Sequence, residues 1–211
     1  MSRKYIRYQY IFPPRVEYKI LPESLNKYDD NTYYAQVKLD GSNCSIYVDG
    51  KLNYIKNRHD GDLSLFRLKD NEMNKLHQGE GFDMFVGEYM NKSKKDKNNN
   101  IFNHKFVIFD VIVNKGKHLT GSTYIERYNM LKNMFELEDY DEYFWKISDN
   151  IFLVKSFEDN FYERFKEIIK IDMLEGFVLK RKTGKLERGT REKNNIGWAI
   201  KARKGCLNYT F

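Results

Sequence analysis

Residues 35–50 read AQVKLDGSNCSIYVDG and place a lysine among apolar, strand-like residues. The alternation of side chains over residues 33–39 predicts a β-strand, and Asp40 with Gly41 predicts the turn that ends it. Lys38 therefore lies at the end of a strand. It is either a solvated charge at that end or a nucleophile held where a substrate reaches it.

Further elements are predicted on both sides of this stretch. A hairpin is predicted from strands over 44–48 and 52–56 around the Asp49–Gly50 turn. Other strands are predicted over 82–90, 105–113, 175–184 and 197–205, and helices over 63–77, 124–135 (opened by a Thr123–Glu126 capping box) and 159–172. Residues 91–100 predict a solvated, mobile loop. Without a βαβ rhythm, the pattern predicts one α+β domain over 1–211, with antiparallel sheets, flanking helices and an extended lead-in over 1–30.

Composition limits the class of protein. The 211 residues are 41% hydrophobic and 16% aromatic, which is typical of a folded domain, and the net charge of +7 favours polyanionic partners. Cys44 and Cys206 make neither a disulfide framework nor a zinc motif, which fits a reducing cytosol. The longest apolar run, FVIFDVIV over 106–113, is too short to span a bilayer. We expect a soluble, cytoplasmic, monomeric protein that does not bind membranes.

A lysine nucleophile sets demands on its surroundings. With an ordinary pKa near 10.4, about one amine in a few thousand is neutral at pH 7. Neighbouring cations or a metal ion must lower that pKa, and the target must be strongly electrophilic. The α-phosphorus of ATP with bound Mg²⁺ is such a target. The short pattern K-x-D-G carries little weight alone, because Asp40–Gly41 also suits an ordinary turn.

Six segments together resemble the covalent nucleotidyltransferases, which comprise ATP-dependent DNA and RNA ligases and mRNA-capping guanylyltransferases. In the family's order they are KLDGSN (38–43), KNRHDG (56–61), FVGEYM (85–90), FVIFDVIV (106–113), EGFVLKRK (175–182) and WAIKARK (198–204). The resemblance covers about residues 33–204. It implies an adenylation domain of the ligase type (ATP-grasp-like), and we expect no OB-fold in this chain.

The resemblance also implies roles for single residues. Lys38 would form the covalent adduct with AMP, with ATP and Mg²⁺ (or Mn²⁺) as cofactors and Glu175 near the metal ion. Nucleotide contacts are implied for Gln36, Lys38, Asp40, Asn43, Arg58, Glu88, Phe109, Glu175, Lys180, Lys201 and Arg203. Alternatives remain open for several of these residues. Arg58 could be a surface arginine, Phe109 a core residue, and Lys180 either a phosphate contact or a solvated charge. Glu88 could be an edge charge, Glu175 a helix-terminal charge, and the role of Gln36 is left open.

The polynucleotide is less well specified. Asn43 stands where DNA ligases and capping enzymes tend to have arginine, and this resembles the second type of phage RNA ligase. That resemblance implies an RNA ligase that joins 5′-phosphate and 3′-hydroxyl ends, in the cytoplasm of a host cell if the protein is viral. Asp40 and Arg203 depart from that group, which often has histidine and lysine there. A minimal DNA ligase, a guanylyltransferase and a non-catalytic nucleic-acid-binding module are the alternatives.

Overall fold

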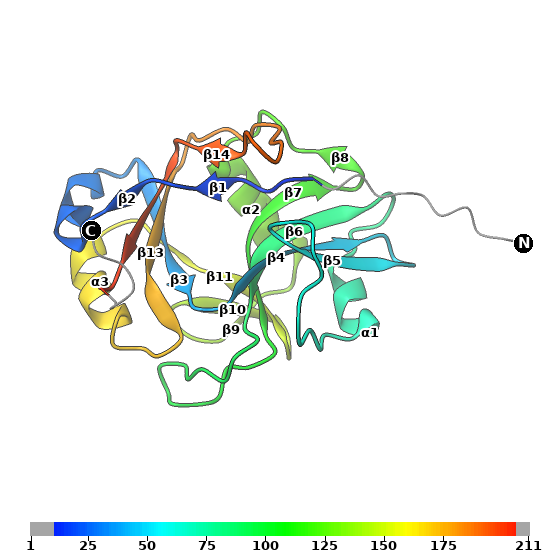
Figure 1. The fold of residues 1–211 in the computed structure, drawn as a ribbon, viewed down its shortest axis with the longest axis horizontal. Helices are drawn as coiled ribbons and strands as arrows, with labels where there is room; N and C mark the ends of the chain where they lie inside the picture. The colour runs from blue at the N-terminus through cyan, green and yellow to red at the C-terminus, as the bar shows by residue number, and fades with distance from the viewer. Residues whose placement is uncertain (1–10, 206–211) are drawn as a thin grey trace, which may run out of the picture.

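The computed structural model describes residues 11–205, whose strands form two large sheets and one two-stranded ribbon (Figure 1). The eight-stranded sheet has the order β5 (Asn53–Asn57), β4 (Ser42–Val48), β6 (Asp83–Tyr89), β7 (Phe106–Asn114), β11 (Ile151–Val154), β10 (Phe144–Ser148) and β9 (Glu138–Asp139), with β8 (Lys117–His118) paired to β7. The five-stranded sheet has the order β12 (Ser156–Phe157), β3 (Tyr33–Leu39), β13 (Leu174–Arg181), β15 (Ala199–Arg203) and β2 (Lys19–Ile20). The ribbon pairs β1 (Arg15–Val16) with β14 (Asn195–Ile196).

Helices flank the sheets. The helical segments are α1 (Asp70–Met73), α2 (Tyr124–Met134), α3 (Phe161–Ile168) and the 3₁₀ helices η1 (Pro22–Tyr28) and η2 (Asn74–Leu76). The predicted capping box is confirmed, since the Glu126 N–H donates to Thr123 and the Thr123 N–H donates to the Glu126 carboxylate. Figure 1 shows α2 beside β7, and α3 next to η1 on the side of the five-stranded sheet that includes β13.

The strand predictions around Lys38 are confirmed. Strand β3 spans residues 33–39, and β4 and β5 form the predicted hairpin, with Val48 opposite Asn53. Both large sheets are mainly antiparallel, so the predicted α+β class is also confirmed. Period-2 alternation and Asp–Gly turn chemistry are local signals, which explains why the sequence carried them clearly.

Several elements differ from the predictions. Strand β11 runs parallel to β7, and the connection between them passes through α2, so one crossover is present where we expected none. The β10–β11 hairpin over 144–154 was not predicted. Only residues 70–76 of the predicted 63–77 helix are helical. The predicted lead-in is extended at β1 and β2 but turns helical at η1, and its first ten residues lie outside the described part of the chain.

Residues 91–100 form the predicted loop, and most of them are exposed, but one side chain anchors the loop in the domain. The Asp96 side chain is buried and accepts hydrogen bonds from the N–H groups of Asn98 and Asn100 and from the hydroxyl of Tyr140. Phe102, just beyond the loop, is also buried. A buried carboxylate with three donors fixes its backbone, so this lysine-rich segment is ordered.

The hydrophobic core has two main parts. One lies on the face of the five-stranded sheet that carries Val37 and Phe177, where it packs against α3. The other surrounds β4, β6 and β7 and contacts α2 through Leu131. The face of the five-stranded sheet opposite α3 carries a smaller hydrophobic cluster around Tyr34, Tyr124 and Trp198, and polar groups occupy the rest of it. None of the helices found between residues 11 and 205 has the length and apolar character of a membrane span.

Candidate active site

Strand register gathers the predicted residues on one face of the five-stranded sheet. Lys38 lies opposite Gly176 on β13, and Gly176 lies opposite Arg203 on β15. In the same way Gln36 and Lys201 both lie opposite Val178. Directly opposed residues point to the same side of a sheet. The nucleophile candidate and the two cations of the last motif therefore share the face that the α3 core does not occupy.

Lys38, Glu175 and Arg203 form what we call the nucleophile cluster. The Lys38 amine forms an ion pair with Glu175 Oε2, and the Arg203 guanidinium lies 3.1 Å from the same oxygen. All three side chains keep between 18% and 27% of their surface exposed, so a ligand has access to them. One carboxylate oxygen thus balances two cations, which leaves positive charge available for an incoming phosphate.

Gly176 explains how Glu175 reaches this face. Its φ is +144°, a conformation that favours glycine, and a Cβ there would lie 2.1 Å from the Ala202 carbonyl oxygen. The β13–β3 register shifts between Leu174 and Gly176. Such an irregularity re-aims the neighbouring side chain. The glycine of the EGFVLK motif therefore permits the backbone that turns Glu175 toward Lys38.

Glu88 comes to the site from the eight-stranded sheet. It lies opposite Asn43 in the β4–β6 register, and the Gly41 N–H donates to its carboxylate. A Cβ on Gly41 would lie 2.9 Å from Glu88 Cγ, so the glycine allows this approach. Loss of hydration raises the pKa of Glu88 to about 7; the Glu175 charge adds to the rise and Lys38 opposes it.

Lys201 stands beside the nucleophile cluster. Its amine donates to the Val16 carbonyl oxygen at 2.9 Å. Burial lowers the pKa of Lys201, and the positive charges of Arg203, Lys19 and Lys38 lower it further. These cations therefore lie close enough to repel one another, which is the electrostatic setting that a polyphosphate relieves.

Phe109 on β7 and Gln36 on β3 are two of the residues predicted to contact the nucleotide. Phe109 is partly exposed in a strand whose other residues, Phe106 to Val113, are buried. Gln36 is 2% exposed and donates from Nε2 to Ser156 Oγ, while its Oε1 has no hydrogen-bond partner within the described chain. An exposed aromatic ring and an unsatisfied buried acceptor are features that a flat, hydrogen-bonding base would complete.

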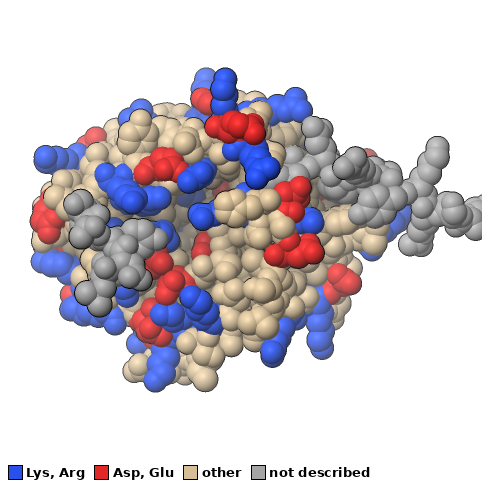
Figure 2. Space-filling view, viewed as in Figure 1, with Lys and Arg blue, Asp and Glu red and all other residues tan. Residues whose placement is uncertain are grey.

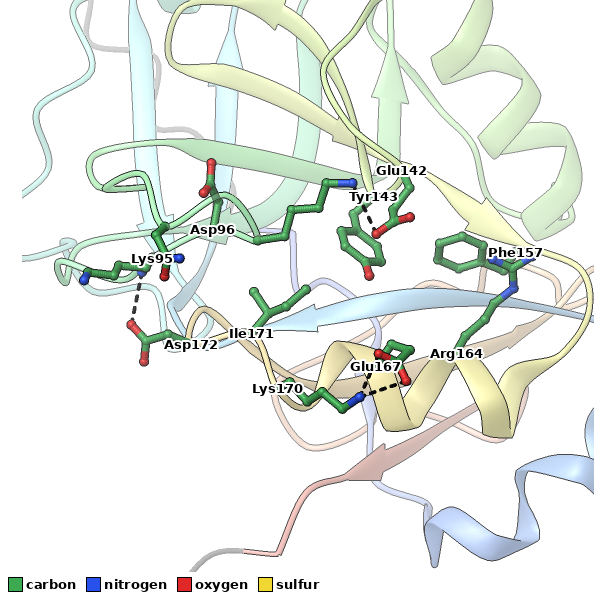
Figure 3. Close-up of a pocket in the computed structure, with 12 residues that line it drawn as sticks. Lys95, Asp96, Glu142, Tyr143, Phe157, Arg164, Glu167, Lys170, Ile171 and Asp172 are labelled. Atoms are coloured by element: carbon green, nitrogen blue, oxygen red, sulfur yellow. Dashed lines mark hydrogen bonds and ion pairs between the residues drawn. The ribbon is translucent and has the colours of Figure 1, made fainter.

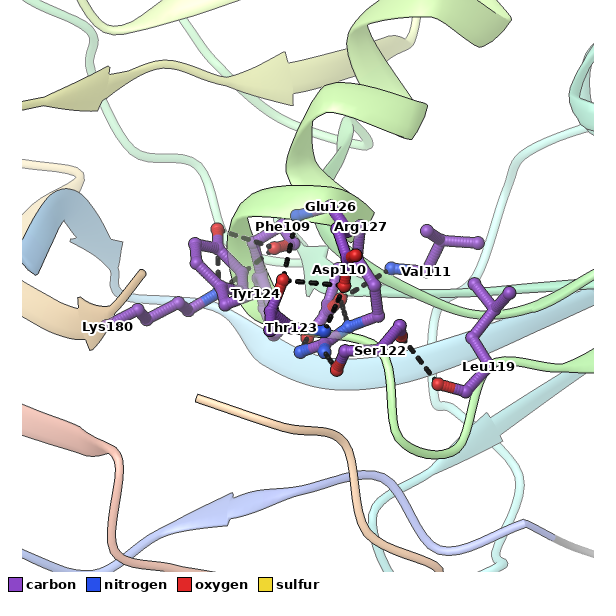
Figure 4. Close-up of polar contacts among 10 residues, drawn as sticks. All are labelled: Phe109, Asp110, Val111, Leu119, Ser122, Thr123, Tyr124, Glu126, Arg127 and Lys180. Atoms are coloured by element: carbon purple, nitrogen blue, oxygen red, sulfur yellow. Dashed lines mark hydrogen bonds and ion pairs between the residues drawn. The ribbon is translucent and has the colours of Figure 1, made fainter. Parts of the chain in front are cut away.

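The structure buries Lys180, which corrects the interpretation of this residue as a solvated charge. Its amine donates to the Phe109 carbonyl oxygen at 3.0 Å and lies 4.5 Å from the centre of the Tyr124 ring (Figure 4). Burial lowers the pKa of Lys180 to about 7, and the nearby Arg127 charge contributes while Asp110 opposes it. Lys180 therefore holds the backbone of Phe109 in place through this hydrogen bond.

Asp110 and Arg127 lie beside Lys180 and complete what we call the buried network. Arg127 is fully buried and donates to both Asp110 oxygens, at 2.8 and 3.0 Å, and to the Ser122 carbonyl oxygen (Figure 4). The sequence analysis did not assign this pair. The available signal was Asp110 itself, because a charge inside an apolar strand requires a partner.

Three predicted residues lie at the edges of the site. Asn43 donates to the Gly87 carbonyl oxygen at 3.5 Å, between β4 and β6. Asp40 points to Lys94 rather than to Lys38. Arg58 is exposed at the turn after β5, and within residues 11–205 its side chain hydrogen-bonds only His59. The structure does not bring Arg58 into contact with the other predicted residues.

Charge on the visible face is mixed. Figure 2 shows Lys and Arg side chains beside Asp and Glu side chains near the middle of this face, with no continuous basic surface. The cations of the nucleophile cluster are therefore individual side chains paired with a carboxylate, within a protein of net charge +7.

A family model described as RNA ligase matches residues 31–196, which include five of the six motifs in full. This chain belongs to the RNA ligase family. No curated protein sequence matches the chain. The family assignment therefore rests on the whole matched segment, which holds β3 and β13 with Lys38 and Glu175 and ends before β15 with Arg203.

Several solved ligase structures are similar to this chain in fold. The ligase domain of LigD from M. tuberculosis has a TM-score of 0.60 at 13% identity, over 92% of this chain and 59% of that one. Mycobacterial DNA ligase D, complexed with ATP and MES, has a TM-score of 0.62 at 13% identity, over 92% and 60%. A Lig E DNA ligase structure has a TM-score of 0.50 at 16% identity, over 82% and 62%. This RNA ligase family member spans about three fifths of those chains.

Proposed function

We propose that this chain is the adenylation domain of an ATP-dependent RNA ligase, acting as a monomer in the cytoplasm, with residues 1–211 as a single domain. The observation that carries the proposal is the nucleophile cluster, in which the Lys38 amine shares one carboxylate oxygen with Arg203. An amine held by a carboxylate and surrounded by cations suits attack on a phosphorus atom.

The proposed reaction has three transfers at one site. The Lys38 nitrogen attacks the α-phosphorus of ATP, forms a phosphoramide bond to AMP and displaces pyrophosphate. A 5′-phosphate oxygen of the polynucleotide then takes the AMP from Lys38, and a 3′-hydroxyl displaces AMP as the strand is sealed. Lys201 and Arg203 would balance the charge that develops on the phosphates, and Lys38 would lose its proton toward Glu175 before the first attack.

A divalent ion fits the donor set. The described residues hold no group of three or more side chains suited to a metal ion. Mg²⁺ in phosphoryl transfer commonly takes one or two carboxylates together with phosphate oxygens, so a full protein cage is not required. Glu175 would bind the Mg²⁺ ion, and Glu88 lies close to Glu175. Such an ion would polarise the α-phosphate when bound.

Gln36 supports ATP over GTP. Nε2 donates to Ser156, while Oε1 is an acceptor without a partner among the described residues, and a bound base would supply the missing donor. The amino group at position 6 of adenine donates a hydrogen bond, whereas the carbonyl at the same position of guanine is an acceptor and would leave both oxygens unsatisfied. This arrangement also weakens the guanylyltransferase alternative.

A DNA ligase is the second candidate function. Asp40 stands where RNA ligases of the second type often have histidine, and two of the similar solved structures are DNA ligases, at 13% and 16% identity. Asn43 and the family match favour RNA. The two candidates predict the same chemistry at Lys38 and differ only in the strand that is joined.

The proposal is tested by labelling and ligation. Incubation with ATP labelled at the α-phosphate should give a labelled protein that Lys38→Ala does not form, and labelled GTP should give at least about 10-fold less. Matched nicked duplexes with RNA or DNA at the joined ends then separate the two candidates. Labelling that persists in Lys38→Ala, or no labelling by ATP, contradicts the proposed chemistry.

A further inference from the structure

Lys94 joins the turn after the nucleophile to the segment before β13. Its amine lies 3.0 Å from Asp40 Oδ2 and 3.2 Å from Asp172 Oδ1, and the side chain is 23% exposed. Burial opposes the charge of Asp40, but the Lys94 contact outweighs it and keeps the pKa of Asp40 below its usual value. The ammonium therefore serves two carboxylates from different parts of the chain.

Backbone hydrogen bonds hold the same three segments together. The Lys95 N–H donates to Asp172 at 3.0 Å, a contact that Figure 3 shows at the end of the loop. The Met173 N–H donates to the Lys95 carbonyl oxygen at 3.2 Å, and the Asp40 N–H donates to the Met173 carbonyl oxygen at 3.0 Å. Lys94 thus sits at the centre of a connected set of contacts.

The two carboxylates that bind Lys94 lie close in sequence to Lys38 and Glu175. Asp40 follows Lys38 by two residues, and Asp172 precedes Glu175 by three residues. Asp40 binds Lys94 and Glu175 binds Lys38, so each carboxylate at this end of the two strands has a lysine partner. By binding both Asp40 and Asp172, Lys94 fixes the distance between the strand end that carries Lys38 and the strand start that carries Glu175.

We propose that Lys94 is a positioning residue for the formation of lysyl-AMP, acting through Asp40 and Asp172 on the Lys38–Glu175 pair. The inference rests on the proposed function, since it concerns the first step of that reaction. Lys94 does not touch the reacting atoms. It holds the two segments in the geometry that in-line attack requires, where a displacement of 1 Å costs about 100-fold in rate.

Another lysine of the same loop gives a matched control. Lys97 lies 3.3 Å from Glu142 and faces a cavity of about 640 Å³ between the loop and α3 (Figure 3). Among the described residues its ion pair is with Glu142, and it forms none with Asp40, Asp172 or Glu175. Lys97→Ala removes the same charge from the same loop and should leave the labelling rate within about 2-fold of the unaltered protein, as for an exposed ion pair.

The test is the single-turnover rate of Lys38 labelling at saturating ATP. Lys94→Ala should lower this rate by about 10- to 100-fold and change the KM for ATP by less than about 3-fold, because geometry and not binding is lost. Lys94→Arg, which keeps a cation that reaches both carboxylates, should restore most of the rate. A rate for Lys94→Ala within 2-fold of Lys97→Ala overturns the inference.

A double-mutant cycle separates positioning from general destabilisation. If Lys94 acts through Asp40, adding Lys94→Ala to Asp40→Asn should slow labelling by less than about 2-fold beyond Asp40→Asn alone. If the double variant slows labelling by the product of the two single effects, the inference is contradicted. Asp172→Asn replaces Lys94→Ala if that variant does not fold, and should also slow labelling. Absence of labelling in the unaltered protein would instead contradict the proposed function itself.

Discussion

The nucleophile cluster and the buried network use the same kinds of charged group in opposite ways. In the nucleophile cluster, two cations share one oxygen of Glu175 and all three side chains remain accessible. In the buried network, Arg127 makes two bonds to Asp110 and a third to a carbonyl oxygen, with no exposed surface. The first arrangement leaves charge for a ligand, and the second leaves none.

The comparison distinguishes charged groups that are available to a ligand from charged groups that stabilise the fold. A shared, accessible carboxylate contributes little to folding but keeps cations in place for phosphate. A saturated, buried pair contributes nothing to chemistry directly but fixes β7 against α2, and so fixes Phe109. Four substitutions, each in one of these regions or beside it, test this difference in order of decreasing expected effect.

Lys38→Met should abolish labelling with ATP while the free energy of unfolding changes by less than about 1 kcal/mol, because Glu175 keeps its contact with Arg203. Urea denaturation and the labelling assay measure the two effects on the same preparation. A loss of more than about 3 kcal/mol would show that the nucleophile cluster is structural in the same sense as the buried network.

Arg127→Met should lower the free energy of unfolding by about 3–5 kcal/mol, because it leaves Asp110 buried without its partner. Urea denaturation is the measurement. Lys170→Met is the control, since Lys170 forms an exposed pair with Glu167, and it should cost at most about 0.5 kcal/mol. Equal effects of the two variants would contradict the assignment of the pair as a structural centre.

Glu88→Gln should remove a pH dependence of stability. The pKa of Glu88 rises from 4.5 to about 7 on folding, so the folded protein holds a proton that the unfolded chain releases between these values. Stability of the unaltered protein should therefore fall as pH rises from 4.5 to 7. The difference in melting temperature from Glu88→Gln should change by at least about 2 °C across this range.

Lys180→Met should remove the opposite dependence in the next pH range. The pKa of Lys180 falls from 10.5 to about 7 on folding, so the unfolded chain binds the proton that the folded protein lacks. Stability of the unaltered protein should rise with pH from 7 to 10.5, and the rise in melting temperature should be smaller in Lys180→Met by at least about 2 °C. Melting curves at pH 7, 8 and 9 test the sign.

The parts predicted from sequence are those with local or ordered signals. Alternation fixed β3 and its hairpin, and the motif order brought Lys38, Glu175 and Arg203 together as expected. The parallel pairing of β11 with β7 was missed because nothing local specifies which distant strand an apolar run joins. Arg58 shows the limit of carrying a role over from a motif, since its side chain lies apart from the cluster.

Composition alone left two features of the structure unpredicted. The run of lysines and asparagines over 91–100 is typical of solvated loops, but buried Asp96 orders it and Lys94 ties it to Asp40. Lys180 at a strand end gave no sign of which way it points. In both cases the deciding partner lies tens of residues away, and a single sequence does not report such pairings.

The contacts of Lys201 have a consequence for how the protein acquires activity. Its amine bonds the carbonyl of Val16, 185 residues earlier in the chain, and Lys38 bonds Glu175 across 137 residues. Contacts of such long range form late in folding and make it slow. During synthesis, the Lys201 contact cannot form until β15 has left the ribosome. Shorter nascent chains therefore contain Lys38 but lack Lys201 and Arg203 of β15.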